Sequence, residues 1–182
     1  MITVTKMTAT EYLQGQETSQ PMHLIEGEIV VMPTPKSVHQ RIVKLVLRLL
    51  ESHTPNGEVF IAPLDVIFDD KTVLQPDVFW VAEGGLCDPS GPYPKGAPDL
   101  IVEIISPGSI RLDRKIKFGL YEKFGVREYW MLTPEENLAE VWTRRDDKFA
   151  LIGVYDASET FESPLLGSIE VRALFPAVDA AP

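Results

Sequence analysis

The apolar positions between Pro98 and Pro107 form the clearest pattern in the chain. The residues between these prolines are mostly aliphatic or β-branched, in the sequence DLIVEIIS. Such a run is typical of a short strand that is buried on both faces, yet it carries the carboxylate of Glu103 at its centre. Because an ionised carboxylate is costly to bury alone, Glu103 is expected beside a cation, a metal ion or a hydrogen-bond network. The alternative is an edge strand on which Glu103 faces water.

A long helix is predicted from about Ser37 to Ser52. Apolar residues recur there at helical spacing, and polar side chains occupy the opposite face. His39 lies in the first turn of this helix. For a single histidine at such a position, a surface or capping role is favoured over a catalytic one.

A second helix is predicted from Ile110 to Phe124, with Gly125 as its C-cap. Its apolar spacing predicts a buried stripe of Ile116, Leu120 and Phe124. An adjacent stripe, spaced i, i+4 and i+8, consists of Asp113, Lys117 and Tyr121. From the margin of the buried face, Lys117 can reach toward the sheet.

The other apolar runs predict short strands separated by turns. A hairpin is expected over residues 22–32, with its turn at Glu26-Gly27. Residues 82–97, rich in Gly and Pro, are expected to form a long surface loop. An antiparallel meander is predicted from strands at 58–62, 64–68 and 73–81. Later strands are predicted at 127–132 and 138–143, with weaker candidates at 148–155 and 168–174.

The strand predicted at 73–81 carries a second acid among apolar neighbours. Alternation places Leu74, Val78 and Trp80 on one of its faces. The other face then contains Gln75, Asp77, Phe79 and Val81. Asp77 is therefore a carboxylate on a largely apolar face, unless Pro76-Asp77 marks a strand edge.

Composition narrows the class of protein. The 182 residues, of which 45% are hydrophobic, predict one domain over 1–182 with a substantial core. No run of about 18 apolar residues and no signal-peptide pattern is present, which predicts a soluble cytoplasmic protein. The single cysteine, Cys87, fits a reducing compartment. A formal charge of −10 argues against broad non-specific nucleic-acid binding, so any binding of DNA must rely on a local basic patch.

The two acids and the helix-borne lysine suggest one kind of chemistry. Asp77 and Glu103 can point from the same sheet face and share a hard cation such as Mg²⁺ or Mn²⁺, which prefers oxygen ligands. Such a cation lowers the pKa of a bound water. Lys117 can then orient that water or stabilise charge at a phosphorus centre.

Several motifs together resemble one known family. They are QPDV at 75–78, APDLIVEIISP at 97–107, Asp113 with Lys117 and Tyr121, and GVREYW at 125–130, with support from Glu26-Gly27, Pro35, His39 and APLDV at 62–66. In these residues, from about 22 to 143, the chain resembles the PD-(D/E)XK nuclease superfamily and, within it, the restriction-endonuclease-like family commonly called Uma-two. The resemblance implies an α/β (α+β) fold with a mixed central sheet flanked by helices. The acids and the lysine are then expected to cluster where the strands diverge.

The resemblance also implies roles for individual residues. Catalytic roles fall to Asp77, Glu103 and Lys117, metal binding to Asp77 and Glu103, and supporting roles to His39, Tyr121, Asp113 and Glu26, although Glu26 could be only a turn residue. In the usual superfamily pattern the lysine stands two residues after the second acid, where this chain has Ile105. Lys117, and not Lys115, aligns with the lysine of the family. The family often has a Glu where this chain has His23, which leaves an acidic contribution from that strand open.

Two functions follow from these residues. The first is a Mg²⁺- or Mn²⁺-dependent DNA endonuclease, expected as a homodimer because cutting both strands suits two-fold symmetry. The second is a non-catalytic dimeric binding or assembly module that keeps the nuclease fold, in line with the charge of −10 and with Ile105. A site that has lost its activity should lose its acids as readily as its lysine. The presence of Asp77, Glu103 and Lys117 together therefore favours the endonuclease. Candidate cations for DNA are Lys36, Arg41, Lys44, Arg111, Arg114 and Lys115.

Overall fold

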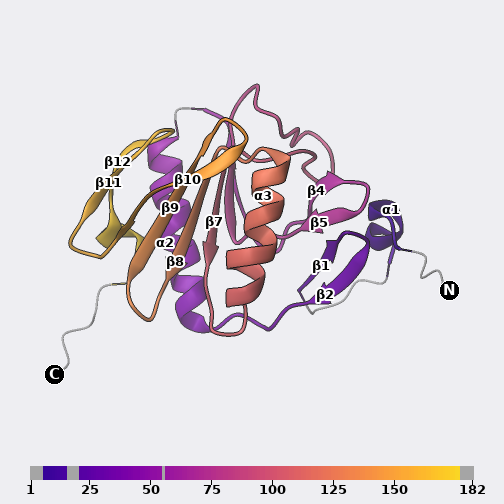
Figure 1. Ribbon diagram of the computed structural model, residues 1–182, viewed down its shortest axis with the longest axis horizontal. Helices are drawn as coiled ribbons and strands as arrows, with labels where there is room; N and C mark the ends of the chain where they lie inside the picture. Colours follow the sequence, from indigo (N-terminus) through magenta and orange to yellow (C-terminus); the bar gives the residue numbers. More distant parts are fainter. Residues whose placement is uncertain (1–5, 16–20, 55, 177–182) are drawn as a thin grey trace.

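The computed structural model describes residues 6–15, 21–54 and 56–176. Within these residues, the central element is a six-stranded mixed sheet with the strand order β10-β9-β8-β7-β6-β3 (Figure 1). Its strands are β3 (Glu58–Ile61), β6 (Val78–Val81), β7 (Leu100–Ile104), β8 (Glu128–Thr133), β9 (Leu138–Arg145) and β10 (Lys148–Tyr155). β7 and β8 run parallel, and the other neighbouring strands are antiparallel. Because β7 lies between β6 and β8, Glu103 is on an interior strand and not on an edge.

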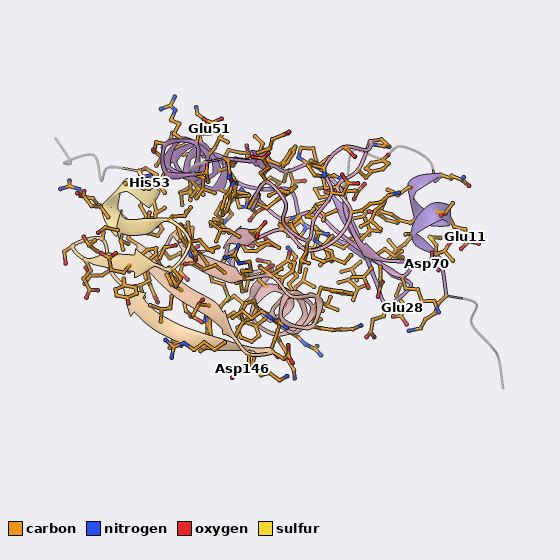
Figure 2. The ribbon with its side chains drawn as sticks, turned by 90° about the horizontal axis from the view of Figure 1, so that it is seen from above. Glu11, Glu28, Glu51, His53, Asp70 and Asp146 are labelled. Carbon is orange, nitrogen blue, oxygen red and sulfur yellow. The ribbon has the colours of Figure 1, made fainter. Side chains whose placement is uncertain are left out.

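Helices cover both faces of this sheet. α2 (Ser37–His53) lies against one face, where Ile42, Val46 and Leu50 are fully buried beside β6, β7 and β8. α3 (Phe118–Phe124) lies against the other face, where Leu120 and Tyr121 are buried. Figure 2 shows the two helices on opposite sides, with Glu51 and His53 at the end of α2. The mixed sheet flanked by helices that the family resemblance implies is therefore present.

A second, smaller sheet stands beside the first. Within the described residues it has the order β2-β1-β5-β4, from β1 (Met22–Ile25), β2 (Glu28–Val31), β4 (Val66–Asp69) and β5 (Thr72–Leu74). β1 and β2 form the predicted hairpin. α1 (Ala9–Leu13) packs on this sheet through Ala9, which shares a small core with Leu24 and Val73. Glu11, Glu28 and Asp70 mark this end of the molecule (Figure 2).

The predicted strand 73–81 is wrong as a single element. β5 ends at Leu74 and β6 begins at Val78, and the two strands belong to different sheets. Pro76 explains the break, since proline has no N–H to donate to a ladder and restricts the backbone of the preceding residue. Gln75 lies outside both strands, and its N–H donates to Nδ1 of His23 at 3.2 Å.

The predicted meander is wrong for the same reason. β3 pairs with β6 in the large sheet, whereas β4 pairs with β5 in the small one. Leu74 packs in the same core cluster as Phe79, contrary to the predicted alternation, while Val78 and Trp80 do share the opposite face. The 168–174 candidate is only partly a strand, since β12 (Gly167–Glu170) pairs with β11 (Thr160–Ser163) and is followed by the 3₁₀ helix η2 (Val171–Leu174).

The second helix contains a π-helical segment, η1 (Leu112–Lys117), immediately before α3. The N–H of Phe118 donates to the carbonyl of Asp113, five residues earlier. This wider turn changes which side chains face the sheet. Asp113 and Lys117 are buried, whereas Ile116 is 37% exposed, so the predicted burial of Ile116 is wrong. π-helical turns of this kind occur frequently at functional sites.

In the part of the chain that the structure describes, no helix has both the length and the apolar character needed to cross a membrane.

The predicted C-cap of α3 can be tested directly. Gly125 has φ = 95°, a left-handed conformation, and no crowding would oppose a Cβ there. Gly125→Ala should therefore lower the free energy of unfolding by about 1–2 kcal/mol through backbone strain alone. Gly119→Ala is the matched control: Gly119 lies inside α3 with open space around it, so alanine should raise the free energy of unfolding by about 0.5–1 kcal/mol. Urea denaturation of the two variants measures both changes, and equal effects would contradict the C-cap assignment.

Candidate active site

Glu103 lies near the end of β7 and points toward the helix that follows it. It shares the α3 side of the sheet with Ile101 and Ile105, as the alternation of a strand requires. The side chain is 2% exposed. Oε1 of Glu103 accepts a hydrogen bond from Lys117 Nζ at 2.9 Å and another from the Tyr121 hydroxyl at 2.6 Å. The cation and the hydrogen-bond network expected for a buried carboxylate are therefore both present.

Lys117 is buried between two acids. Besides Glu103, its Nζ lies 3.2 Å from Oδ1 of Asp113, an i,i+4 ion pair without directed hydrogen-bond geometry. Burial by itself lowers the pKa of Lys117, but the carboxylates of Glu103, Asp113 and Asp77 outweigh it and raise that pKa above its ordinary value. Lys117 is therefore charged at neutral pH.

Asp77 occupies the residue just before β6, at the edge of the same site. Its Oδ2 accepts the backbone N–H of Ile104 at 2.8 Å and lies 3.0 Å from Nε2 of His39. The carboxylate is thus fixed at the carboxyl end of β7, next to Glu103. His39, in the first turn of α2, has a side chain that is only 14% exposed. The surface or capping role favoured for His39 is therefore wrong.

Negative charge exceeds positive charge in this cluster. Within the described residues it contains three carboxylates, those of Asp77, Glu103 and Asp113, around the single ammonium of Lys117. Burial raises the pKa of Glu103 to about 8, with Asp77 and Asp113 adding to the rise and Lys117 opposing it. Burial and the Glu103 carboxylate raise the pKa of Tyr121, so its hydroxyl stays protonated and donates. The excess of carboxylates over ammonium groups leaves the site able to take one more cation.

A pocket of about 580 Å³ opens onto these groups. The charged and histidine side chains that line it, apart from the exposed Lys36 and Glu135, are buried or half-buried. They are His23, His39, Asp77, Glu103, Asp113 and Lys117. They come from β1, α2, the start of β6, β7 and η1, so both sheets contribute to the wall. Ile105 also lines the pocket, on the same strand face as Glu103.

The structure brings together most residues that the sequence singles out, but not Glu26. Asp77, Glu103, Lys117, His39 and Asp113 line the pocket, and Tyr121 supports Glu103 from the core. Glu26 stands in the exposed turn between β1 and β2 with φ = 50° and does not line the pocket. Its predicted supporting role is therefore wrong, and the reading of Glu26 as a turn residue holds.

His23 is the site residue that sequence reasoning did not find. In the sequence, His23 stands out only as the residue at a position where the family often has a Glu. In the structure it is 2% exposed and lines the pocket from β1. A histidine inside a short apolar strand is too common to identify a site, and the Glu that the family often has at this position does not point to a histidine.

Comparison with known proteins places the chain in a family. A family model described as “Uma2: Putative restriction endonuclease” matches residues 9–174. The chain belongs to the Uma2 family. This is the family named Uma-two above, so the resemblance seen in the sequence is confirmed.

Relatives of this Uma2 protein carry little further information on activity. Two uncharacterised proteins of Synechocystis sp. match it, one 28% identical over 69% of this chain and 73% of that protein, the other 27% identical over 89% and 87%. A crystal structure from Anabaena variabilis, described as a “putative nuclease belonging to DUF820”, matches with a TM-score of 0.77. It is 22% identical and covers 93% of this chain and 97% of its own. The likeness confirms the restriction-endonuclease-like fold.

The raised pKa of Glu103 predicts how stability depends on pH in the absence of metal. Between about pH 4.5 and 8 the folded state holds a proton that the unfolded state has lost, so the free energy of unfolding should fall as pH rises. Glu103→Gln cannot ionise and should lose less stability over that window. Urea denaturation in chelator at pH 5.5 and 7.5 measures the difference between the two proteins.

Glu122→Gln is the control for this experiment. Hydrogen bonds from Lys148 and from the N–H of Phe149 lower the pKa of Glu122, so it stays ionised throughout the window. That variant should follow the pH dependence of the wild type. An identical pH dependence in wild type and Glu103→Gln would show that Glu103 is ionised at both pH values.

Proposed function

We propose that this Uma2 protein is a metal-dependent DNA endonuclease that hydrolyses phosphodiester bonds. The observation that carries the proposal is the meeting of Asp77, Glu103 and Lys117 at one pocket. These side chains come from three separate elements, and a buried ion pair of this kind gives a core little stability compared with apolar packing. Strongly perturbed acids and bases in a pocket are typical of catalytic sites.

The acceptor atoms left over in the site support a metal rather than a purely structural network. Within the described residues, no hydrogen bond reaches Oε2 of Glu103 or Oδ1 of Asp77. Neither oxygen is among the buried side-chain atoms without a partner, so both open toward the pocket, where an ion could reach them. The described residues contain no cluster of three or more His, Cys, Asp or Glu with metal-site geometry, so a closed protein cage does not fit. Two carboxylates suit Mg²⁺ or Mn²⁺, which retain several waters.

Each residue then has a separate role. Asp77 and Glu103 hold the ion, which when bound lowers the pKa of a water and offsets the charge of the phosphate. Lys117 supplies a fixed positive charge beside Glu103 that can stabilise charge developing at the phosphorus centre. Asp113 keeps Lys117 in place, and Tyr121 fixes the orientation of the Glu103 carboxylate. The backbone N–H of Ile104 and the ring of His39 hold Asp77.

DNA would approach along the exposed cations near the pocket. Lys36 lines it, and Arg41 and Lys44 are exposed on α2, while Arg111 and Lys115 are exposed at the start of the second helix. Arg114 is less suited, because its guanidinium already donates to Glu140 at 2.6 Å. The description of the Anabaena protein as a “putative nuclease” agrees with a nucleic-acid substrate. A homodimer and a cytoplasmic location stay predictions.

A cleavage assay with a matched pair of lysine variants tests the proposal. Wild-type protein should cleave plasmid or single-stranded DNA in Mg²⁺ or Mn²⁺ and not in chelator. Lys117→Ala should lose about 100- to 1,000-fold in rate, the size expected for a group that stabilises transition-state charge. Lys115→Ala, two residues away and exposed, should retain the rate.

Asp77→Asn serves as the control for contamination in this assay. It should be inactive and bind divalent ions weakly, so cleavage that persists in it would come from another nuclease. A Lys117→Ala protein that cleaves like wild type would contradict the role of the lysine. A folded wild type without activity on either DNA would favour the non-catalytic binding or assembly module.

A second experiment tests whether position 105 is equivalent in space to position 117. Ile105 lines the pocket on the face of Glu103, where the usual superfamily pattern places its lysine. The double change Ile105→Lys with Lys117→Ala should recover part of the rate that Lys117→Ala loses, with divalent binding intact in both. Burying a new lysine stem costs stability, so circular dichroism must first show that the double variant is folded. A folded double variant without any recovery would contradict the equivalence of the two positions.

A further inference from the structure

The hydrogen bond at Nδ1 determines the proton position of His23. Nδ1 lies 3.2 Å from the backbone nitrogen of Gln75, at the break between β5 and β6. A backbone N–H can only donate, so Nδ1 must present its lone pair. Since a neutral imidazole carries one proton, that proton is on Nε2.

The surroundings of His23 keep this ring neutral. Burial lowers the pKa of His23 well below its ordinary value of 6.5, and the positive charge of Lys117 acts in the same direction. His23 therefore offers one N–H donor and no charge. With its proton on Nε2, that nitrogen has no lone pair left to bind a metal ion.

Nε2 of His23 lacks an acceptor in the part of the chain that the structure describes. The side chain is nine-tenths buried or more and lines the same pocket as Lys117. A buried N–H without a partner costs free energy, and native proteins satisfy nearly all such groups. An acceptor supplied from the pocket would remove that cost.

We propose that the Nε2–H of His23 is an anion-binding subsite that donates to a non-bridging oxygen of the phosphodiester. The inference rests on the proposed function and adds a substrate contact to it. Three carboxylates outnumber the ammonium of Lys117 in this pocket and repel a phosphoryl oxygen. The hydrogen bond from the neutral N–H of His23 would offset part of that repulsion. His23 thereby contributes a substrate contact from the small sheet to a pocket whose Glu103 lies in the large sheet.

Two amide variants separate the two nitrogens of His23. The amide nitrogen of His23→Gln reaches the position of Nε2, whereas the amide oxygen of His23→Asn takes the position of Nδ1. Gln therefore keeps the donor toward the pocket, and Asn keeps the acceptor for the N–H of Gln75. We expect His23→Gln to cleave within about 5-fold of wild type and His23→Asn to lose about 100-fold in kcat, the size expected for one donor to developing charge. The melting temperatures should have the opposite order, with Asn nearer to wild type.

The opposite orders of rate and stability make this comparison decisive. A histidine that only held the backbone of Gln75 would make His23→Asn the more active variant. Rates for His23→Asn equal to wild type, or equal rates for the two variants, would overturn the subsite.

Nuclear magnetic resonance gives a readout that does not need cleavage. The probe is the phosphodiester dinucleotide thymidylyl-thymidine, added in chelator to protein with ¹⁵N-labelled histidine. The Nε2–H signal of His23 should shift with the dinucleotide and not with thymidine, which has no phosphate. No shift at any dinucleotide concentration would mean that the atom bonds only to water and would overturn the subsite. A shift in a protein that does not cleave DNA would leave the subsite standing and reject the endonuclease, so the two failures can be told apart.

Discussion

The buried ion pair between Glu103 and Lys117 is the constraint on which the rest of the site depends. Taking both charges out of water is costly, and only close geometry with additional hydrogen bonds compensates for it. The chain meets this demand with an interior strand for Glu103, a π-helical turn that directs Lys117 inward, and the hydroxyl of Tyr121 on the same carboxylate oxygen. The π-helical segment of the second helix thus lies where it brings Lys117 to Glu103.

The elements of the fold that a local apolar pattern defines, such as the strand around Glu103 and the helix α2, could be predicted from the sequence. The run around Glu103 predicted a strand because its apolar residues are continuous, although an interior and an edge position both stayed open. The helix α2 was evident because one face is apolar along its whole length. The acids and the lysine were recognised by residue type and order. Their convergence was proposed from strand alternation and order and was supported by the resemblance, because nothing local joins Asp77 to Glu103, 26 positions away.

What the sequence missed depends on contacts between distant segments. Apolar residues continue on both sides of Pro76, so alternation alone could not show that β5 and β6 join different sheets. The prediction for Ile116 assumed the spacing of a regular α-helix. The π-helical turn changes that spacing, so Ile116 is exposed where the α-helical pattern predicts burial. The contact of His39 with Asp77 and the bond of His23 to Gln75 each join segments far apart in the chain.

The break at residues 75–77 couples the shape of the pocket to the angle between two sheets. One side of the break is held by His23 of the small sheet, and the other by the backbone of Ile104 in the large sheet. The separation of His23 from Lys117 is therefore a property of how the sheets are joined, not of either residue. A change that tilts the small sheet, even at the packing of α1 against it, alters the width of the pocket without touching any group that does chemistry.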